Sequence, residues 1–119
     1  MAWHVEFDDQ FDREFGVFAE AVQDAILEMA GLLALLGPTL KRPHADTLSG
    51  SRHANMKELR CRAADGVWRI AFAFDPDRKA VLLVAGDKSG GSEKRFYRHL
   101  IATADARFDR HLAARERKE

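Results

Sequence analysis

Three arginines, Arg60, Arg62 and Arg69, lie close together in the middle of the chain. A guanidinium group stays charged at every physiological pH and binds phosphate through two parallel hydrogen bonds. Arginines that converge on one surface can therefore recognise a phosphate-bearing partner, or stabilise negative charge that develops on phosphorus during a reaction. An alternative stays open, because Glu58 and Asp65 are near enough in sequence to hold these arginines in ordinary surface ion pairs.

Two further residues that can act on a phosphate or move a proton follow the arginines along the chain. Lys88 lies in a glycine-rich stretch, residues 86–92, and Tyr97, the only tyrosine, comes shortly after it beside Lys94 and Arg95. A lysine adds positive charge to a phosphate site, and a phenolic hydroxyl can donate or accept a proton. A tyrosine in this setting can equally be a packing residue that is half buried in the core.

Other kinds of catalytic site leave no pattern in the sequence. The five histidines are scattered without the spacing of metal ligands, and no serine lies in a G-x-S-x-G context. Neither a P-loop nor a dinucleotide-binding fingerprint is present, and the single cysteine, Cys61, excludes an internal disulfide. We therefore expect a site that uses neither a metal nor a cofactor.

The arginines fall in two segments that are predicted to form a β-hairpin. Met56–Arg62 and Val67–Phe74 are the predicted strands, and the turn signal Asp65-Gly66 separates them. Side chains along a strand alternate between two faces, so the three arginines and Glu58 should share one face. The apolar residues of the second strand share the other face: Trp68, Ile70, Phe72 and Phe74.

The charged face of this hairpin is expected to be open to solvent. An antiparallel sheet commonly packs one face on helices and leaves the other exposed. Ala71 and Ala73 lie beside Arg69 on the charged face, and their small side chains predict a shallow groove there.

The N-terminal part of the chain predicts a short strand followed by helix. Trp3–Phe7 alternates apolar and polar residues with a period of two. Apolar residues then recur at steps of three or four from Phe11 to Leu36, as in one long helix or two consecutive helices that break near Gly16. Gly37-Pro38 ends this helical stretch.

The rest of the chain predicts one connector, one strand and one helix. Residues 39–55 hold too few apolar side chains to form a core element, whereas Ala80–Ala85 suits a buried central strand and Ser92 begins a final helix. The predicted fold is α+β and two-layered, with an N-terminal strand, two helices or one kinked helix, an antiparallel three-stranded meander and a C-terminal helix.

Composition favours a single globular domain over residues 1–119. Hydrophobic residues make up 46% of the chain and charged residues 32%, a balance typical of folded proteins. No signal peptide is recognisable, and the longest apolar run, Met29–Leu36, is too short to span a bilayer. We therefore expect a cytoplasmic protein without a membrane partner.

The net charge is zero, but the charge is unevenly distributed. Residues 1–50 contain three basic and nine acidic residues, and residues 51–119 contain sixteen basic and ten acidic ones. This asymmetry favours an anionic partner for the second half of the chain, or two halves that attract each other on folding.

Three phrases of the sequence, together with the order of the predicted elements, resemble one protein family over nearly the whole chain. They are Lys57-Glu58-Leu59-Arg60, Gly66-Val67-Trp68-Arg69-Ile70 and Val81-Leu82-Leu83-Val84-Ala85-Gly86-Asp87-Lys88. They resemble the RelE/ParE toxin superfamily of bacterial toxin–antitoxin modules, and in particular its phage-derived Gp49/HigB-like branch.

The resemblance implies a toxin of a type II toxin–antitoxin system that inhibits translation. Such toxins cleave mRNA on the ribosome without a metal, by attack of a ribose 2′-OH on the adjacent phosphate. The implied partners are mRNA, the ribosome and a cognate antitoxin, expected to be a small helix-turn-helix protein. Carried over by position, the catalytic residues are Arg60, Arg69, Lys88 and Tyr97, and the RNA-binding residues are Arg62, Lys57, Lys94 and Arg95.

Two other functions on the same fold stay open. One is a ParE-like inhibitor of DNA gyrase, which binds its target without cleaving nucleic acid. The other is an inactive antitoxin-binding module, which the neutral net charge favours. Glu58 bears on the choice, because its carboxylate would partly cancel the field of the neighbouring arginines.

Overall fold

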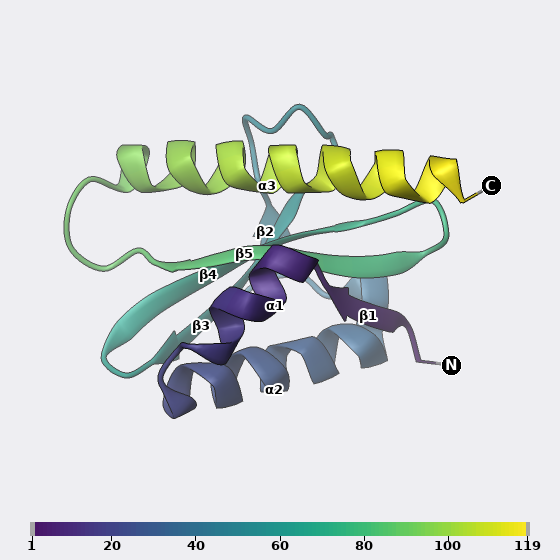
Figure 1. Cartoon of the computed structure of the whole chain (residues 1–119). Helices are drawn as coiled ribbons and strands as arrows, with labels where there is room; N and C mark the ends of the chain where they lie inside the picture. Colours follow the sequence, from purple (N-terminus) through teal and green to yellow (C-terminus); the bar gives the residue numbers. More distant parts are fainter. Residues whose placement is uncertain (1, 119) are drawn as a thin grey trace.

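The computed structural model describes residues 2–118 as a five-stranded sheet between helices (Figure 1). In chain order the elements are β1 (His4–Phe7), α1 (Asp9–Gly16), α2 (Glu20–Leu36), a short 3-10 helix (Gly37–Thr39), β2 (Ala45–Thr47), β3 (Lys57–Ala63), β4 (Gly66–Phe74), β5 (Lys79–Asp87) and α3 (Glu93–Arg117).

The strands lie in the order β1-β5-β4-β3-β2. β3, β4 and β5 form the predicted antiparallel meander, while β1 adds to β5 in parallel and β2 adds to β3 antiparallel. The hairpin turn falls at Ala64 and Asp65, one residue earlier than predicted, and both residues have the positive φ that a two-residue hairpin turn needs. A Cβ at Gly66 would lie 2.7 Å from a carboxylate oxygen of Asp87, so a larger residue there would force that side chain to shift.

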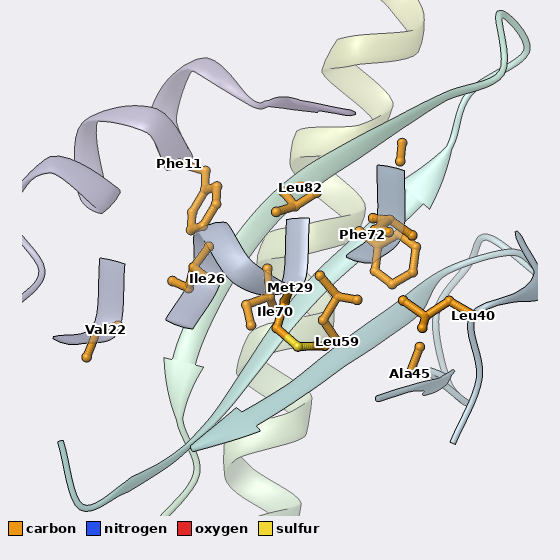
Figure 2. Close-up of a cluster of buried hydrophobic side chains, with 12 residues drawn as sticks. Phe11, Val22, Ile26, Met29, Leu40, Ala45, Leu59, Ile70, Phe72 and Leu82 are labelled. Atoms are coloured by element: carbon orange, nitrogen blue, oxygen red, sulfur yellow. The ribbon is translucent and has the colours of Figure 1, made fainter. Parts of the chain in front are cut away.

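The helices α1 and α2 cover one face of the sheet. Their apolar residues pack on the alternate strand residues that the sequence assigned to the core, as Figure 2 shows. The largest buried side chains of this first core are Phe11, Ile26, Leu33, Leu59, Ile70, Phe72 and Leu82.

The opposite face is covered by α3, so the sheet lies in the middle of three layers rather than at the surface of two (Figure 1). Ala71 and Ala73 are fully buried and pack in a second core with Leu100, Ala104 and Phe108 of α3. The predicted order of elements is confirmed, but the open face and its shallow groove are wrong. The small alanines make room for a helix to lie close to the sheet.

The long helical stretch divides into two helices, as one of the two predicted alternatives had it. Val17 ends α1, and the extended backbone of Ala19 precedes α2. Gly37 ends α2 with a φ of +54°, and a Cβ at that position would lie 2.3 Å from the Trp3 ring. Glycine is therefore required both by the backbone and by the indole that packs on it.

The predicted connector contains a strand that the sequence interpretation missed. β2 is only three residues long, yet it extends the sheet beyond β3, and Leu40, Ala45 and Leu48 around it are buried. The prediction that residues 39–55 lie outside the core is therefore wrong.

One stretch, Glu20–Thr39, is long and apolar enough by length and composition to cross a membrane, with a mean hydropathy of 1.3. In the folded chain its residues Val22, Ile26, Met29 and Leu33 are buried against the sheet at helical spacing. Packing of this buried stripe accounts for part of that hydropathy, whereas Leu27, Leu35 and Leu36 of the same stretch are exposed.

Candidate functional site

Arg60 of β3 and Arg69 of β4 lie directly opposite each other in the hairpin. The backbone N–H of Arg60 donates to the carbonyl of His44 at 2.8 Å, on the side away from β4. In an antiparallel ladder this makes the two arginines a non-hydrogen-bonded pair, the kind in which side chains approach most closely. Two like charges in such a pair repel each other, so an anion is needed beside them.

Glu58 supplies that anion. Its Oε2 lies 3.7 Å from Nε of Arg60, and its Oε1 lies 3.8 Å from Nε of Arg69. The side chain of Glu58 is only 6% exposed. Burial raises the pKa of this carboxyl above the ordinary value, although a hydrogen bond from Tyr97 and the charges of both arginines oppose the rise.

The hydroxyl of Tyr97 joins the two sides of this arrangement. It donates to Oε1 of Glu58 at 2.9 Å and accepts from Nε of Arg69 at 3.2 Å. Burial and the neighbouring carboxylate raise the pKa of the phenol, so Tyr97 keeps its proton at neutral pH. The ring comes from the first turns of α3, which the Ser92 side chain caps by accepting from the backbone N–H of Arg95.

Lys88 follows β5 and is held over the same ring. Its backbone N–H donates to the Val67 carbonyl at 2.7 Å, and its Nζ lies 6.0 Å from the centre of the Tyr97 ring. The ammonium also bonds Oε1 of Glu93 at 2.6 Å, and this contact lowers the pKa of Glu93. Lys88 therefore adds a cation to the group.

The structure thus places Arg60, Arg69 and Tyr97 around Glu58 and Lys88 beside the Tyr97 ring, so the four residues predicted to be catalytic lie together with Glu58. We call these five residues the arginine cluster. Their depth differs: the side chains of Arg69 and Glu58 are 8% and 6% exposed, whereas those of Arg60 and Lys88 are 30% and 21% exposed. A ligand approaching from solvent meets Arg60 and Lys88 before it meets Arg69.

The four residues predicted to bind RNA are spread more widely than the four predicted to be catalytic. Arg62 is exposed on the same face of β3 as Arg60, whereas Lys57 lies on the face that carries Leu59, towards α2. Lys94 and Arg95 are exposed in the first turn of α3, and Arg95 lines a separate groove. Of these four, Arg62 best extends the surface of the arginine cluster.

Glu58 is the member of the cluster that received no functional role from the sequence. Glu58 lies two residues before Arg60 on the same strand, so alternation of side chains placed it on the same face. That alternation was the signal in the sequence that could have identified it. Its burial could not be predicted, because it depends on α3 covering a face that was expected to be open.

A second group of polar side chains lies at the other end of α3. Ligand atoms of Glu6, Asp75 and His111 lie within 4.8 Å of one another. A ring nitrogen of His111 lies 2.9 Å from a carboxylate oxygen of Asp75, and that carboxylate also accepts from the backbone N–H groups of Asp77 and Lys79. These contacts show that the group anchors the turn between β4 and β5.

The chain matches a known family over most of its length. A model of the phage-derived Gp49-like protein family (DUF891) matches residues 13–109. HigB3 of Mycobacterium tuberculosis, which is named as a toxin, is 46% identical over 95 residues, covering 77% of this chain and 81% of that one. HigB2 of the same organism, also named as a toxin, is 49% identical over 78 residues, which are 65% of this chain but 38% of the relative.

Two solved structures share the fold at low sequence identity. A mutant of the E. coli toxin RelE in the free state gives a TM-score of 0.59 at 14% identity, covering 86% of this chain and 96% of that one. The archaeal RelE–RelB complex from Pyrococcus horikoshii gives a TM-score of 0.56 at 16% identity, with coverages of 76% and 100%. These likenesses confirm the predicted RelE-like fold, and the family match confirms the predicted branch: the chain belongs to the phage-derived Gp49-like family, with HigB3 and HigB2 among its relatives.

Proposed function

We propose that this protein is the toxin of a type II toxin–antitoxin system and that it inhibits translation by cleaving mRNA on the ribosome. Membership of a family with relatives named as toxins supports the toxin role. The observation that carries the nuclease hypothesis is the Arg60–Arg69 pair beside the buried carboxylate of Glu58. The protonated hydroxyl of Tyr97 is hydrogen-bonded to both Glu58 and Arg69. Positive charge and proton-transfer groups in one place are what phosphodiester cleavage requires.

The arginine cluster can bind the phosphate in steps that follow its depth. Arg60 and Lys88 are exposed enough to take the non-bridging oxygens of an incoming phosphate. Lys88 must then exchange its bond to Glu93 for one to the phosphate, at little cost because Glu93 is exposed. Arg69, held behind them, stabilises the extra charge of the five-coordinate transition state.

In the proposed reaction the ribose 2′-oxygen forms a bond to phosphorus while the bond from phosphorus to the 5′-oxygen breaks. Glu58 accepts the 2′-hydroxyl proton, which its raised pKa suits it to hold. Tyr97 gives its proton to the departing 5′-oxygen and recovers one from Glu58, to which it is already hydrogen-bonded. The products are a 2′,3′-cyclic phosphate and a 5′-hydroxyl, and the side chains of the cluster supply each proton.

The proposal extends to the partners and the compartment. Ribosomes and mRNA are the targets, so the protein acts in the cytoplasm. A cognate antitoxin, expected to be a helix-turn-helix protein, neutralises it by covering the arginine cluster with an acidic or helical segment. The archaeal RelE of similar fold is solved as a complex with RelB, which is the precedent for such a complex on this fold.

Induced expression in a bacterial host tests the proposal. Wild-type protein should arrest growth and shorten mRNA on Northern blots, and Arg69→Ala should restore both growth and mRNA. Arg13→Ala is the matched control, because Arg13 is exposed on α1, on the opposite face of the sheet from the cluster. It should stay as toxic as the wild type.

The same blots separate the rival functions. Growth arrest with a DNA-damage response and intact mRNA would replace the proposal with a gyrase inhibitor. Normal growth with wild-type protein that is folded and abundant would leave an antitoxin-binding module.

A further inference from the structure

The outer edge of β5 is unpaired over half its length. β1 pairs with Lys79–Leu82 only, and the chain then leaves the sheet as Asp8, whose backbone N–H donates to the carbonyl of Leu82 at 2.9 Å. From Leu83 to Asp87, no strand within residues 2–118 lies on that side of β5, although the carbonyl of Leu83 already accepts a hydrogen bond from Arg107 at 2.8 Å. An open strand edge presents backbone donors and acceptors to any chain that lies beside it.

The register shows which backbone groups this edge offers. Lys88 donates its backbone N–H to the Val67 carbonyl, so residues 67 and 88 are a hydrogen-bonded pair and so are Arg69 and Gly86. By alternation, the N–H and C=O of Ala85 point away from β4, towards the open edge. A second strand could bond to them without disturbing the sheet.

An apolar groove runs beside this edge. A cavity of about 550 Å³ lies between the edge and α3. The edge residues Val84, Ala85 and Gly86 line one side of it, and Phe18, Phe96, Leu100 and Thr103 contribute further lining. It has room for one or two apolar side chains of a strand laid along the edge.

The charges around the groove favour an acidic occupant. The carboxylate of Glu14 is neutralised by Arg107, whose NH1 and NH2 nitrogens bond its two oxygens at 2.8 and 2.6 Å. Arg95 lines the same cavity, is exposed and makes no ion pair with another residue of the described chain. Among the residues that line the cavity the unbalanced charge is therefore positive, and the Asp87 carboxylate at the end of the edge accepts from the backbone N–H groups of Val67 and Ser89.

We propose that the edge of β5 from Leu83 to Asp87, with the adjoining groove, binds an extended acidic segment of a partner protein as an added β-strand. Main-chain hydrogen bonds to Ala85 give affinity, an apolar side chain fills the groove, and a carboxylate of the segment pairs with Arg95. A peptide is favoured over RNA because the open edge supplies a donor and an acceptor at the spacing of another backbone. The surface is separate from the arginine cluster, and its binding does not depend on RNA cleavage.

The test uses a synthetic ten-residue peptide of alternating valine and glutamate, with a valine–lysine peptide of the same length as its control. Titration into isotopically labelled protein should shift the backbone resonances of residues 83–87 and slow hydrogen exchange at the Ala85 amide. The lysine peptide should bind about tenfold more weakly. Thr103→Trp, which fills the groove from α3, should weaken the acidic peptide about tenfold, and the matched Thr103→Ala should leave its affinity unchanged.

Binding must also survive Arg69→Ala, which abolishes the proposed nuclease, so the two proposals can fail separately. The inference is overturned if the acidic peptide does not bind, if it perturbs residues elsewhere, or if Thr103→Trp leaves its affinity intact. It is also overturned if an RNA oligonucleotide, and not the peptide, produces the shifts at residues 83–87.

Discussion

Glu58 balances the positive charge of the arginine cluster when no ligand is bound. Two opposed arginines would repel each other, and the carboxylate of Glu58, near both of them, removes that repulsion. A bound phosphate would supply the same negative charge. Glu58 therefore has two roles in this account: it stabilises the empty site, and it accepts a proton once a phosphate has taken its place beside the arginines.

The pH dependence of cleavage tests the second role. Because burial raises the pKa of Glu58, the carboxyl should lose its proton only above the ordinary glutamate value of about 4.3. The cleavage rate should therefore fall as the pH drops through that raised pKa. Single-turnover cleavage measured across the acid range should show this limb in the wild type.

Glu58→Gln tests whether Glu58 causes this fall in the cleavage rate at low pH. A glutamine at this position would keep the size of the side chain but could not accept the proton, so the rate should fall about 100-fold or more and lose its acid limb. The substitution also removes one partner of a buried group, at a cost of about 1–3 kcal/mol in the free energy of unfolding. A variant that is folded and retains both the wild-type rate and its pH profile would exclude Glu58 as the base.

At the residue scale the sequence predicted the cluster better than its surroundings. Strand parity and the family resemblance identified Arg60 and Arg69, and the register places them opposite each other. Lys57 was assigned to RNA binding, but parity puts it on the face towards α2. The contact between Tyr97 and Glu58 joins residues 39 positions apart, so the position of α3 decides it rather than any local pattern.

Among the elements, α3 contributes most to the site, because it brings Tyr97 to the hairpin and buries the second face of the sheet. It is fixed to the opposite side of the molecule by Arg107, which bonds both oxygens of Glu14 on α1 and the carbonyl of Leu83. Leu83 lies at the irregularity where β5 carries one residue more than β4. That carbonyl is therefore satisfied by a side chain.

The link between α1 and α3 should be measurable as stability. Glu14→Gln leaves the buried Arg107 guanidinium without its strongest partner, which should cost about 1–3 kcal/mol in the free energy of unfolding. Glu116→Gln is the control, because Glu116 is exposed near the end of α3. Urea unfolding that shows the same small change for both variants would contradict this account of α3.

The sequence predicted most elements because periodicity and turn signals are local. It missed β2, since a three-residue strand is too short to show alternation. It missed the packing of α3 although β4 held a clue: Ile70, Ala71, Phe72 and Ala73 are apolar in succession, as in a strand buried on both faces. The arginine nearby made an open face the more natural interpretation.

At the scale of the whole molecule, the uneven charge has a structural use within the chain. The acidic N-terminal part meets the basic C-terminal part through Glu14 with Arg107 and Asp8 with Arg110, at 2.6 and 3.2 Å. Attraction between the two halves, one of the two interpretations of the charge asymmetry, therefore accounts for part of it. The cations left for a partner are fewer than the composition of residues 51–119 suggests.

RNA affinity should accordingly depend only moderately on salt. Contacts from Arg60, Arg62, Arg69 and Lys88 predict a slope of about −3 for log affinity against log salt on a single strand. Arg62→Ala should reduce that slope by about 0.7. Fluorescence anisotropy with a 2′-O-methyl RNA, which cannot be cleaved, measures both values, and a slope unaffected by Arg62→Ala would remove that residue from the RNA surface.

The central claim, that the arginine cluster cleaves mRNA through the ribose 2′-hydroxyl, is tested most directly by the ends it leaves. Purified protein is incubated with a defined mRNA, free or bound to ribosomes, and the fragments are analysed for their terminal groups. The account predicts cleavage of ribosome-bound mRNA into fragments with 2′,3′-cyclic phosphate and 5′-hydroxyl ends, and none with Arg69→Ala. Intact mRNA with the wild-type protein, or fragments with 5′-phosphate ends, would contradict it.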